Sequence, residues 1–344
     1  MAFQTYSDER DSWGYLYEST FGTPNADNAA FKTIKFPKGV RIETGTTITN
    51  LELNREARQP DASDLYVDDD SGPVRVTVPE FIITKDRLAD LLYACLQNKV
   101  SEGAATAYAK VFKVNVAQPD FTANAGYFFT LAYKSPIAGK DLLVHSCIVK
   151  ELTFSLDKSG TGDQNLAKVS LVILGKKLEI NQTLSGTFVA QGTSRYRAHD
   201  FTYNYNDTTA VPWQSFTIKL DNGAIAQDKD TDGTPKTWHL EWAGENSGTV
   251  DVVHWYTADV TGTTVDLIAD RMAGTVRLNS ISTSTAVGTD GNLKFSFYGK
   301  LKEDPNGSQN KLMMAPASYN LVHNTISTND LVIVNIADAI DQTP

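Results

Sequence analysis

Strict alternation of apolar and polar residues recurs along the chain and indicates β-strands. Leu293, Phe295 and Phe297 share one side of such a segment, and the residues between them occupy the other side. The same period is found in residues 148–156, 216–220, 127–133 and 238–242. Successive side chains of a strand point to opposite faces, so this pattern predicts half-buried strands and a mostly β protein.

One segment has the period of an amphipathic helix instead. Leu88, Leu91, Leu92 and Cys95 follow the i, i+3, i+4, i+7 spacing of an apolar stripe. Thr84 is a candidate N-cap and Asp86 lies in the first turn, where the helix dipole favours negative charge. We therefore expect a helix over residues 85–98 that flanks a sheet.

The two halves of the chain show a similarity at a separation of about 123 to 124 residues. Residues 133–179 correspond to residues 256–303, and each segment contains a Gly-rich turn, a strand and a Gly-Lys pair. Hairpins with such turns share composition by necessity, so both duplication and chance agreement stay open. The helix at residues 85–98 has no obvious counterpart in the second half.

Composition sets limits on the class of protein. Of the 344 residues, 41% are hydrophobic, which is enough for a packed core. A net charge of −10 disfavours a basic nucleic-acid-binding surface. Cys95 and Cys147 lie in apolar contexts, and we expect buried free thiols. The sequence shows neither a secretory leader nor a stretch of 18 apolar residues, so we expect a soluble product made in the cytoplasm.

Few residues form patterns typical of a chemical site. Asp228, Asp230, Asp232 and Gly233 have the spacing of the first half of a calcium loop. The twelfth position is His239 rather than the Glu that completes such a site. A solvated acidic turn is therefore favoured over calcium at residues 228–239, and an exposed loop is favoured at residues 68–70.

The remaining candidates for catalysis or metal binding are equally sparse. Histidines occur at positions 145, 199, 239, 254 and 323 without the spacing of a metal site or a catalytic dyad. No nucleophile elbow, Walker loop or Cys-X-X-Cys motif is present. The sequence predicts no catalytic residue, no cofactor and no metal, and therefore no enzyme.

Residues 14–24 read Gly-Tyr-Leu-Tyr-Glu-Ser-Thr-Phe-Gly-Thr-Pro and contain the signals of a chain that changes direction. Gly22 permits positive φ, and Pro24 favours an extended Thr23. The segment resembles the start of tail tube proteins, or major tail proteins, of long-tailed, siphophage-like bacteriophages. The strand–turn–strand–Gly-Lys pattern of residues 149–177 and the strands and helix of residues 40–98 are similar to the same family. The resemblance covers most of residues 14–180 and, more weakly, residues 210–303.

This resemblance implies a tail-tube-type β-sandwich or barrel with one flanking helix. It implies a virion protein whose rings of six, or of three if the chain is duplicated, stack into a hollow tube through which duplex DNA passes. The implied partners are the chain itself and the tape measure, terminator and distal tail proteins, without any membrane. We expect an N-terminal arm at residues 1–38, a tube domain at residues 39–190 and a second β domain at residues 191–344.

Two other classes of function compete with this interpretation. One is another virion component, such as a neck, baseplate-ring or head-decoration protein. The second is a carbohydrate-binding β-sandwich module or a jelly-roll glycosidase, for which Trp213, Trp238, Trp242 and Trp255 could supply stacking platforms. A glycosidase needs two carboxyl groups facing each other across a cleft, and the sequence identifies no such pair.

The charge balance leads to one further expectation. With 41 acidic and 31 basic residues, the chain can supply a negatively charged lumen that repels DNA phosphates. The alternative is that the acidic excess only makes the outside of the assembly soluble.

Overall fold

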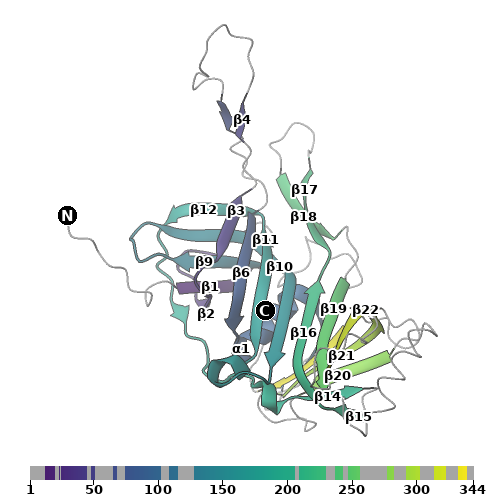
Figure 1. Cartoon of the computed structure of the whole chain (residues 1–344). Helices are drawn as coiled ribbons and strands as arrows, with labels where there is room; N and C mark the ends of the chain where they lie inside the picture. Colours follow the sequence, from purple (N-terminus) through teal and green to yellow (C-terminus); the bar gives the residue numbers. More distant parts are fainter. Residues whose placement is uncertain are drawn as a thin grey trace.

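The protein is built mainly of β-strands. The computed structural model describes residues 12–19, 23, 25–44, 48–50, 65–67, 74–101, 108–114, 128–205, 209–229, 237–242, 247–255, 277–282, 292–302, 314–322 and 332–338. Most strands form two connected sheets, which we call sheet A and sheet B (Figure 1). The single α-helix of this described part is α1 (Lys85–Leu96).

Sheet A contains the N-terminal strands. Its order is β13 (Phe188–Val189), β2 (Phe31–Ile34), β1 (Ser12–Tyr17), β9 (Phe129–Lys134), the first half of β10 (Asp141–Asp157), and β12 (Lys177–Gln182). The pairings are antiparallel, except that β13 runs parallel to β2. β1 therefore lies inside the sheet with a neighbour on each side.

Sheet B begins with a broad layer of seven strands. Their order is β3 (Arg41–Thr44), β6 (Val74–Ile82), β11 (Lys168–Gly175), the second half of β10, β16 (Trp213–Asp221), β19 (Ser247–Trp255) and β22 (Met314–Leu321). The end of β22 pairs with β21 (Asn292–Leu301), where the sheet continues into a second layer.

The second layer is centred on β21. On one side follow β20 (Arg277–Ser282), β14 (Thr202–Tyr205) and β15 (Thr209–Val211). On the other side follow β23 (Val332–Asp338), β8 (Tyr108–Val114) and β7 (Gln97–Ser101). All these pairings are antiparallel, as expected for strands with one buried face.

The two layers of sheet B pack face to face through aromatic side chains. The rings of Phe154 in β10 and Phe295 in β21 have centroids 5.0 Å apart, and those of Phe216 and Phe297 are 6.2 Å apart. All four side chains are buried. The apolar positions that alternate along residues 148–156, 216–220 and 293–297 therefore form the core of a β-sandwich, as the sequence predicts.

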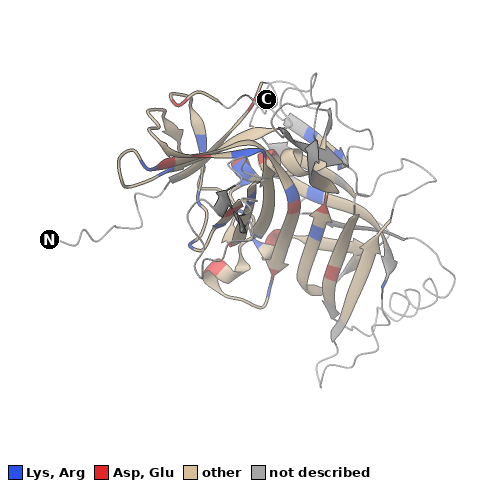
Figure 2. Cartoon of the chain, turned by 90° about the horizontal axis from the view of Figure 1, so that it is seen from above, with Lys and Arg blue, Asp and Glu red and all other residues tan. Residues whose placement is uncertain are grey.

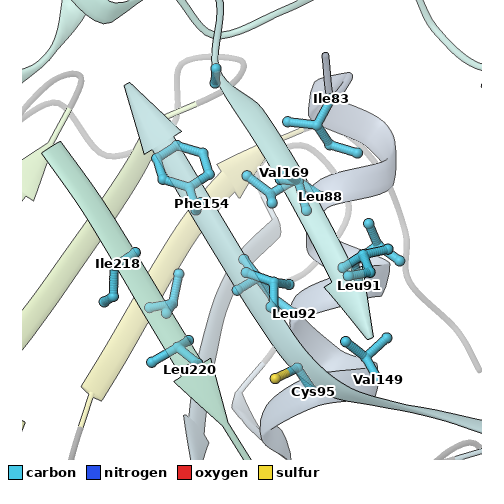
Figure 3. Packing of buried hydrophobic residues seen from close by; sticks show 14 of the residues in the cluster. Ile83, Leu88, Leu91, Leu92, Cys95, Val149, Phe154, Val169, Ile218 and Leu220 are labelled. Carbon is cyan, nitrogen blue, oxygen red and sulfur yellow. The ribbon is translucent and has the colours of Figure 1, made fainter. Parts of the chain in front are cut away.

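Helix α1 fills the space beside this core. Leu88, Leu91, Leu92 and Cys95 are buried and belong to the same cluster as Val149 and Leu220 of sheet B (Figure 3). The helix ends at Leu96, two residues before the predicted end, because Gln97 adopts left-handed backbone angles and begins β7. Thr84 occupies the N-cap position in an extended conformation, but its hydroxyl makes no cap hydrogen bond.

Two hairpins extend beyond the sheets. One is formed by β4 (Ile48–Asn50) and β5 (Leu65–Val67), and the other by β17 (Ala224–Lys229) and β18 (Thr237–Trp242). Both project from the same end of the molecule, at the top of Figure 1. Two short 3-10 helices, η3 (Gly162–Asn165) and η4 (Ala198–Asp200), lie in connecting segments.

The predicted fold class is confirmed: the protein is mostly β, with a sandwich core and one flanking helix. The N-terminal segment differs from expectation. Residues 1–38 were expected to form an arm outside the core, yet β1 and β2 are strands of sheet A, with Tyr15 and Phe31 buried. The aromatic residues of this segment supply the apolar face that a strand needs, which its irregular, polar pattern conceals.

Candidate assembly surfaces

The residues proposed for sugar binding do not form a described aromatic platform. Trp213 is buried, its indole N–H donates to the carbonyl of Phe201, and the Lys158 ammonium lies 4.0 Å from the ring centroid. Burial lowers the pKa of Lys158. Trp238 and Trp242 are in β18, and Trp255 ends β19. Trp213 is therefore a core residue whose face is already covered by a cation.

The acidic turn that has the spacing of half a calcium loop lies on a β-hairpin rather than between two helices. Asp228 belongs to β17 and pairs with Trp238, while His239 belongs to β18 and pairs with Gln227. Residues 230–236 and 68–70 lie outside the described residues. Among the residues that are described, no three His, Cys, Asp or Glu side chains are grouped so that they could hold a metal ion.

The histidines are dispersed. His145 is buried in β10, and its Nε2 atom lies 3.3 Å from Oε2 of Glu179. Burial lowers the pKa of His145, although Glu179 acts in the opposite direction. His199 is exposed in η4, His254 belongs to β19, and His323 lies outside the described residues. Cys95 and Cys147 are buried free thiols, as predicted, and burial raises the pKa of both.

A buried carboxylate holds the point where β10 passes from sheet A to sheet B. Ser146 has a φ of 48° there, and the pairing register shifts between Val144 and Cys147. Glu18 Oε1 accepts hydrogen bonds from the Ser146 amide at 2.7 Å and the Thr130 hydroxyl at 2.8 Å, and Oε2 accepts from the Ser146 hydroxyl at 2.7 Å. Glu18 therefore fixes an unusual backbone conformation.

Polar groups of α1 attach the helix to sheet A. Asp90 is buried and accepts hydrogen bonds from the Tyr15 hydroxyl at 2.6 Å and the Lys32 ammonium at 3.0 Å. Arg87 donates to the carbonyls of Thr33, Val189 and Ala190. The apolar stripe of the helix thus packs against sheet B, and Asp90 and Arg87 bind the helix to sheet A. The period of the stripe could not reveal these charged residues, whose partners are distant in sequence.

The exposed large hydrophobic side chains of the described residues all lie on sheet A or its turns. Ile180 of β12 is 58% exposed, Val189 of β13 is 46% exposed, and Ile137 in the β9–β10 turn is 47% exposed. β12 and β13 are the opposite edges of the sheet. Asn181, with a φ of 59°, interrupts the β12 edge. A sheet edge with exposed aliphatic groups is a typical contact surface.

The outer face of the seven-stranded layer is polar. Ser155, Thr217 and Ser318 belong to its rows of small hydroxyl residues. Three ion pairs lie on it: Lys219–Glu151 at 2.7 Å, Lys168–Glu80 at 3.2 Å and Lys150–Asp221 at 3.8 Å. Acidic and basic residues are interspersed on these strands (Figure 2).

Two acidic residues of this face have no cation partner within the described residues. Asp251 accepts from the Ser318 hydroxyl, and Asp157 accepts from the amide and hydroxyl of Ser159. The face also carries Arg41 and Glu43 of β3 and Arg75 of β6, which are exposed. Its six acidic side chains therefore exceed its five basic ones by one, and its net charge is slightly negative.

Comparison with known proteins shows a similarity to a protein family. A family model described as "Phage tail tube protein" matches residues 12–321, which is most of the chain. No curated protein is similar enough to count as a match. No helix among the described residues combines the length and the apolar character needed to span a membrane.

Proposed function

The chain belongs to the phage tail tube protein family, and we propose that it self-assembles into stacked rings that form a hollow tube for DNA passage. The observation that carries the proposal is the family match, which includes strands of both sheets. The chain is thus a structural component of a virion tail. Its partners would be other copies of itself and the tail proteins at the two ends and inside the tube.

Open backbone edges of sheet B support ring formation. Among the described residues, β3 pairs only with β6, and residues 314–318 of β22 pair only with β19. We place β3 of one subunit beside β22 of the next, so that the sheet continues around the ring. Pro316 lacks an amide hydrogen, so pairing would use the positions on either side of it.

In this arrangement the polar outer face of the seven-stranded layer lines the bore. Small hydroxyl groups and mutually neutralised ion pairs offer no strong binding site to a phosphate backbone. The small excess of acidic side chains on this face, which includes Asp157 and Asp251, disfavours binding of DNA and keeps it mobile. The range of this repulsion is about one Debye length, roughly 8 Å at physiological salt.

The number of subunits in a ring depends on whether the chain is duplicated. Tube domains at residues 39–190 and 191–344 would give a ring of three chains with six-fold pseudosymmetry, whereas one elaborated domain would give a ring of six. Pairing of β10 with β16 joins the two segments in one layer. A layer that is continuous between the two segments is compatible with a ring of three chains and with a ring of six.

Electron microscopy of the concentrated purified protein tests the proposal. We expect rings and tubes in negative stain, with a bore wide enough for duplex DNA. A protein that stays monomeric at all concentrations in analytical ultracentrifugation would contradict the proposed self-assembly. Rings whose bore is lined mainly by Lys and Arg would contradict the proposed orientation of sheet B.

A further inference from the structure

A basic cavity beside the start of α1 has no part in the surfaces described above. It has a volume of about 630 Å3 and lies between the η3 segment and residues 193–199. Two isolated β-bridges hold this second segment in place, one between Thr84 and Arg195 and the other between Leu166 and Arg197. The cavity is therefore part of the ordered framework.

Alternation along residues 195–199 directs the basic side chains toward this cavity. Tyr196 and Ala198 are buried in the core, whereas Arg195, Arg197 and His199 are exposed and line the cavity. Neither guanidinium forms an ion pair with any described residue. In a chain with a net charge of −10, two unpaired arginines at one cavity indicate an acidic partner.

The other side of the cavity offers an acceptor for a peptide. Asn165 lines it, and the Oδ1 atom of its side chain is buried without a hydrogen-bond partner in the described structure. This oxygen could accept from the backbone amide of a bound segment, while the arginines donate to carboxylates. Asp163 is the one acidic side chain among the residues that line the cavity, and it is exposed.

The most acidic segment of the chain belongs to the β4–β5 hairpin and the residues that follow it. Residues 51–72 contain seven acidic and two basic side chains, so they contribute −5 to the net charge of −10. Glu52, Glu56, Asp61 and Asp64 precede β5 in the sequence, and three consecutive aspartates follow it.

The hairpin and the cavity lie at opposite ends of the molecule. β6 starts at Val74, next to the hairpin, and ends at Ile82, two residues before the Thr84–Arg195 bridge. A nine-residue strand is about 30 Å long, so the hairpin of one copy extends away from its own cavity. Figure 1 shows β4 at the top and α1 in the lower part of the molecule.

We propose that acidic residues 51–72 of one copy bind in the basic cavity, lined by Arg195 and Arg197, of the next copy along the tube. The inference rests on the proposed function, because it supplies the contact between successive rings. A head-to-tail contact of this kind leaves a free hairpin at one end and a free cavity at the other, so it propagates. A stack of rings can therefore grow from one subunit type.

Peptide binding tests the contact without requiring assembly. A fluorescent synthetic peptide of residues 51–72 is titrated with the full chain, and binding is followed by anisotropy. We expect the R195E/R197E variant to bind at least about tenfold more weakly, and wild-type binding to weaken as salt rises. The matched control is K35E/K302E, which changes the net charge equally at exposed lysines outside the cavity. Equal affinity of all three proteins would overturn the inference.

A charge exchange tests the contact in the assembly. Circular dichroism first establishes that R195E/R197E folds; if it does not, R195Q/R197Q takes its place. We expect rings without long tubes for this variant and tubes for K35E/K302E. For R195E/R197E we also expect recovery of tubes when Asp68, Asp69 and Asp70 are replaced by Lys, because the charges are then exchanged. Normal tubes from the cavity variant would overturn the inference and leave the proposed function intact. Absence of rings and tubes from the wild type would overturn both.

Discussion

At the scale of single residues, Glu18 is a buried carboxylate on which the junction of the two sheets depends. It is buried, yet three donors from Ser146 and Thr130 surround it. Asn25 extends the network, because its amide donates to the carbonyls of Leu16 and Tyr17 and its backbone N–H donates to the Thr130 hydroxyl. Glu18 lies in the Glu-Ser-Thr segment by which the chain resembles its family, so part of that motif serves to hold β10 in place.

Replacing Glu18 with Ala should lower the free energy of unfolding by about 2–4 kcal/mol, because the buried Ser146 amide loses its acceptor. Urea denaturation followed by circular dichroism gives the value. The matched control is Glu80→Ala, which removes an exposed carboxylate and should change stability by less than about 1 kcal/mol. Equal effects of the two substitutions would refute the role assigned to Glu18.

The stability should also depend on the protonation of Glu18. Burial raises its pKa above the ordinary value of 4.5, although the hydrogen bonds and Lys176 act in the opposite direction. A raised carboxyl pKa means that the folded state binds the proton more tightly, so this stability is present below about 4.5 and is lost as the pH rises through the folded pKa.

We therefore expect the unfolding free energy of the wild type, relative to Glu18→Gln, to decrease as the pH rises from about 4 to about 7. Taking the difference cancels the common contribution of His145, which lies near the same strand junction. Parallel pH profiles of the two proteins would show that Glu18 has the same pKa in the folded and unfolded states.

At the scale of elements, β10 and the β11–β12 corner join the two sheets. β10 belongs to sheet A up to Cys147 and to sheet B from Ile148. β11 leaves sheet B at Gly175, and β12 continues in sheet A. A side chain at Gly175 would meet Cγ1 of Val144 at 2.4 Å and the carbonyl of His145 at 3.2 Å. The β10 and β11 segments can approach each other closely at this corner because position 175 has no side chain.

Gly175→Ala should therefore destabilise the protein by about 1–3 kcal/mol, through overpacking against Val144. The double substitution Gly175→Ala with Val144→Ala should recover part of the loss, because the nearest contact is to the end of a side chain. Thermal unfolding of the two single variants and the double variant gives the coupling free energy. Strictly additive effects would contradict the proposed contact.

At the scale of the whole molecule, the N-terminal segment joins strands that are distant in sequence into one sheet. β1 lies between β2 and β9, and Tyr15 joins it to α1 through Asp90. Sheet A thus depends on residues that come first in sequence and pair with strands more than a hundred positions later. The two sheets and the helix share one hydrophobic cluster, which extends from Tyr15 to Ile336.

Deletion of residues 1–20 should consequently disrupt the fold, and not only assembly. It removes β1 and Glu18, and it exposes one edge of both β2 and β9. We expect loss of the cooperative thermal transition, measured by circular dichroism. Deletion of residues 1–11, which leaves β1 intact, is the control and should preserve the transition. A folded protein after the longer deletion would contradict this structural role and favour the N-terminal arm expected from the sequence.

The local pattern of the sequence determined the elements. Alternation predicted the strands that contain Phe154, Phe216 and Phe295, and the apolar stripe predicted α1, because side-chain periodicity follows directly from backbone geometry. The Glu-Ser-Thr-Phe-Gly-Thr-Pro segment and the hairpin patterns indicated the tail tube family, and the comparison over residues 12–321 confirmed it.

Only the tertiary structure decided which elements meet. Alternation marks a strand but does not name its neighbour, so the sequence could not show that residues 12–17 lie inside sheet A. It could not show that Glu18 reaches Ser146, or that Trp213 is buried under Lys158. The cavity beside Arg195 and Arg197 likewise exists because long-range pairing places residues 193–199 against η3. Such contacts depend on the packing of the whole chain, because the free energy that favours them comes from partners distant in sequence.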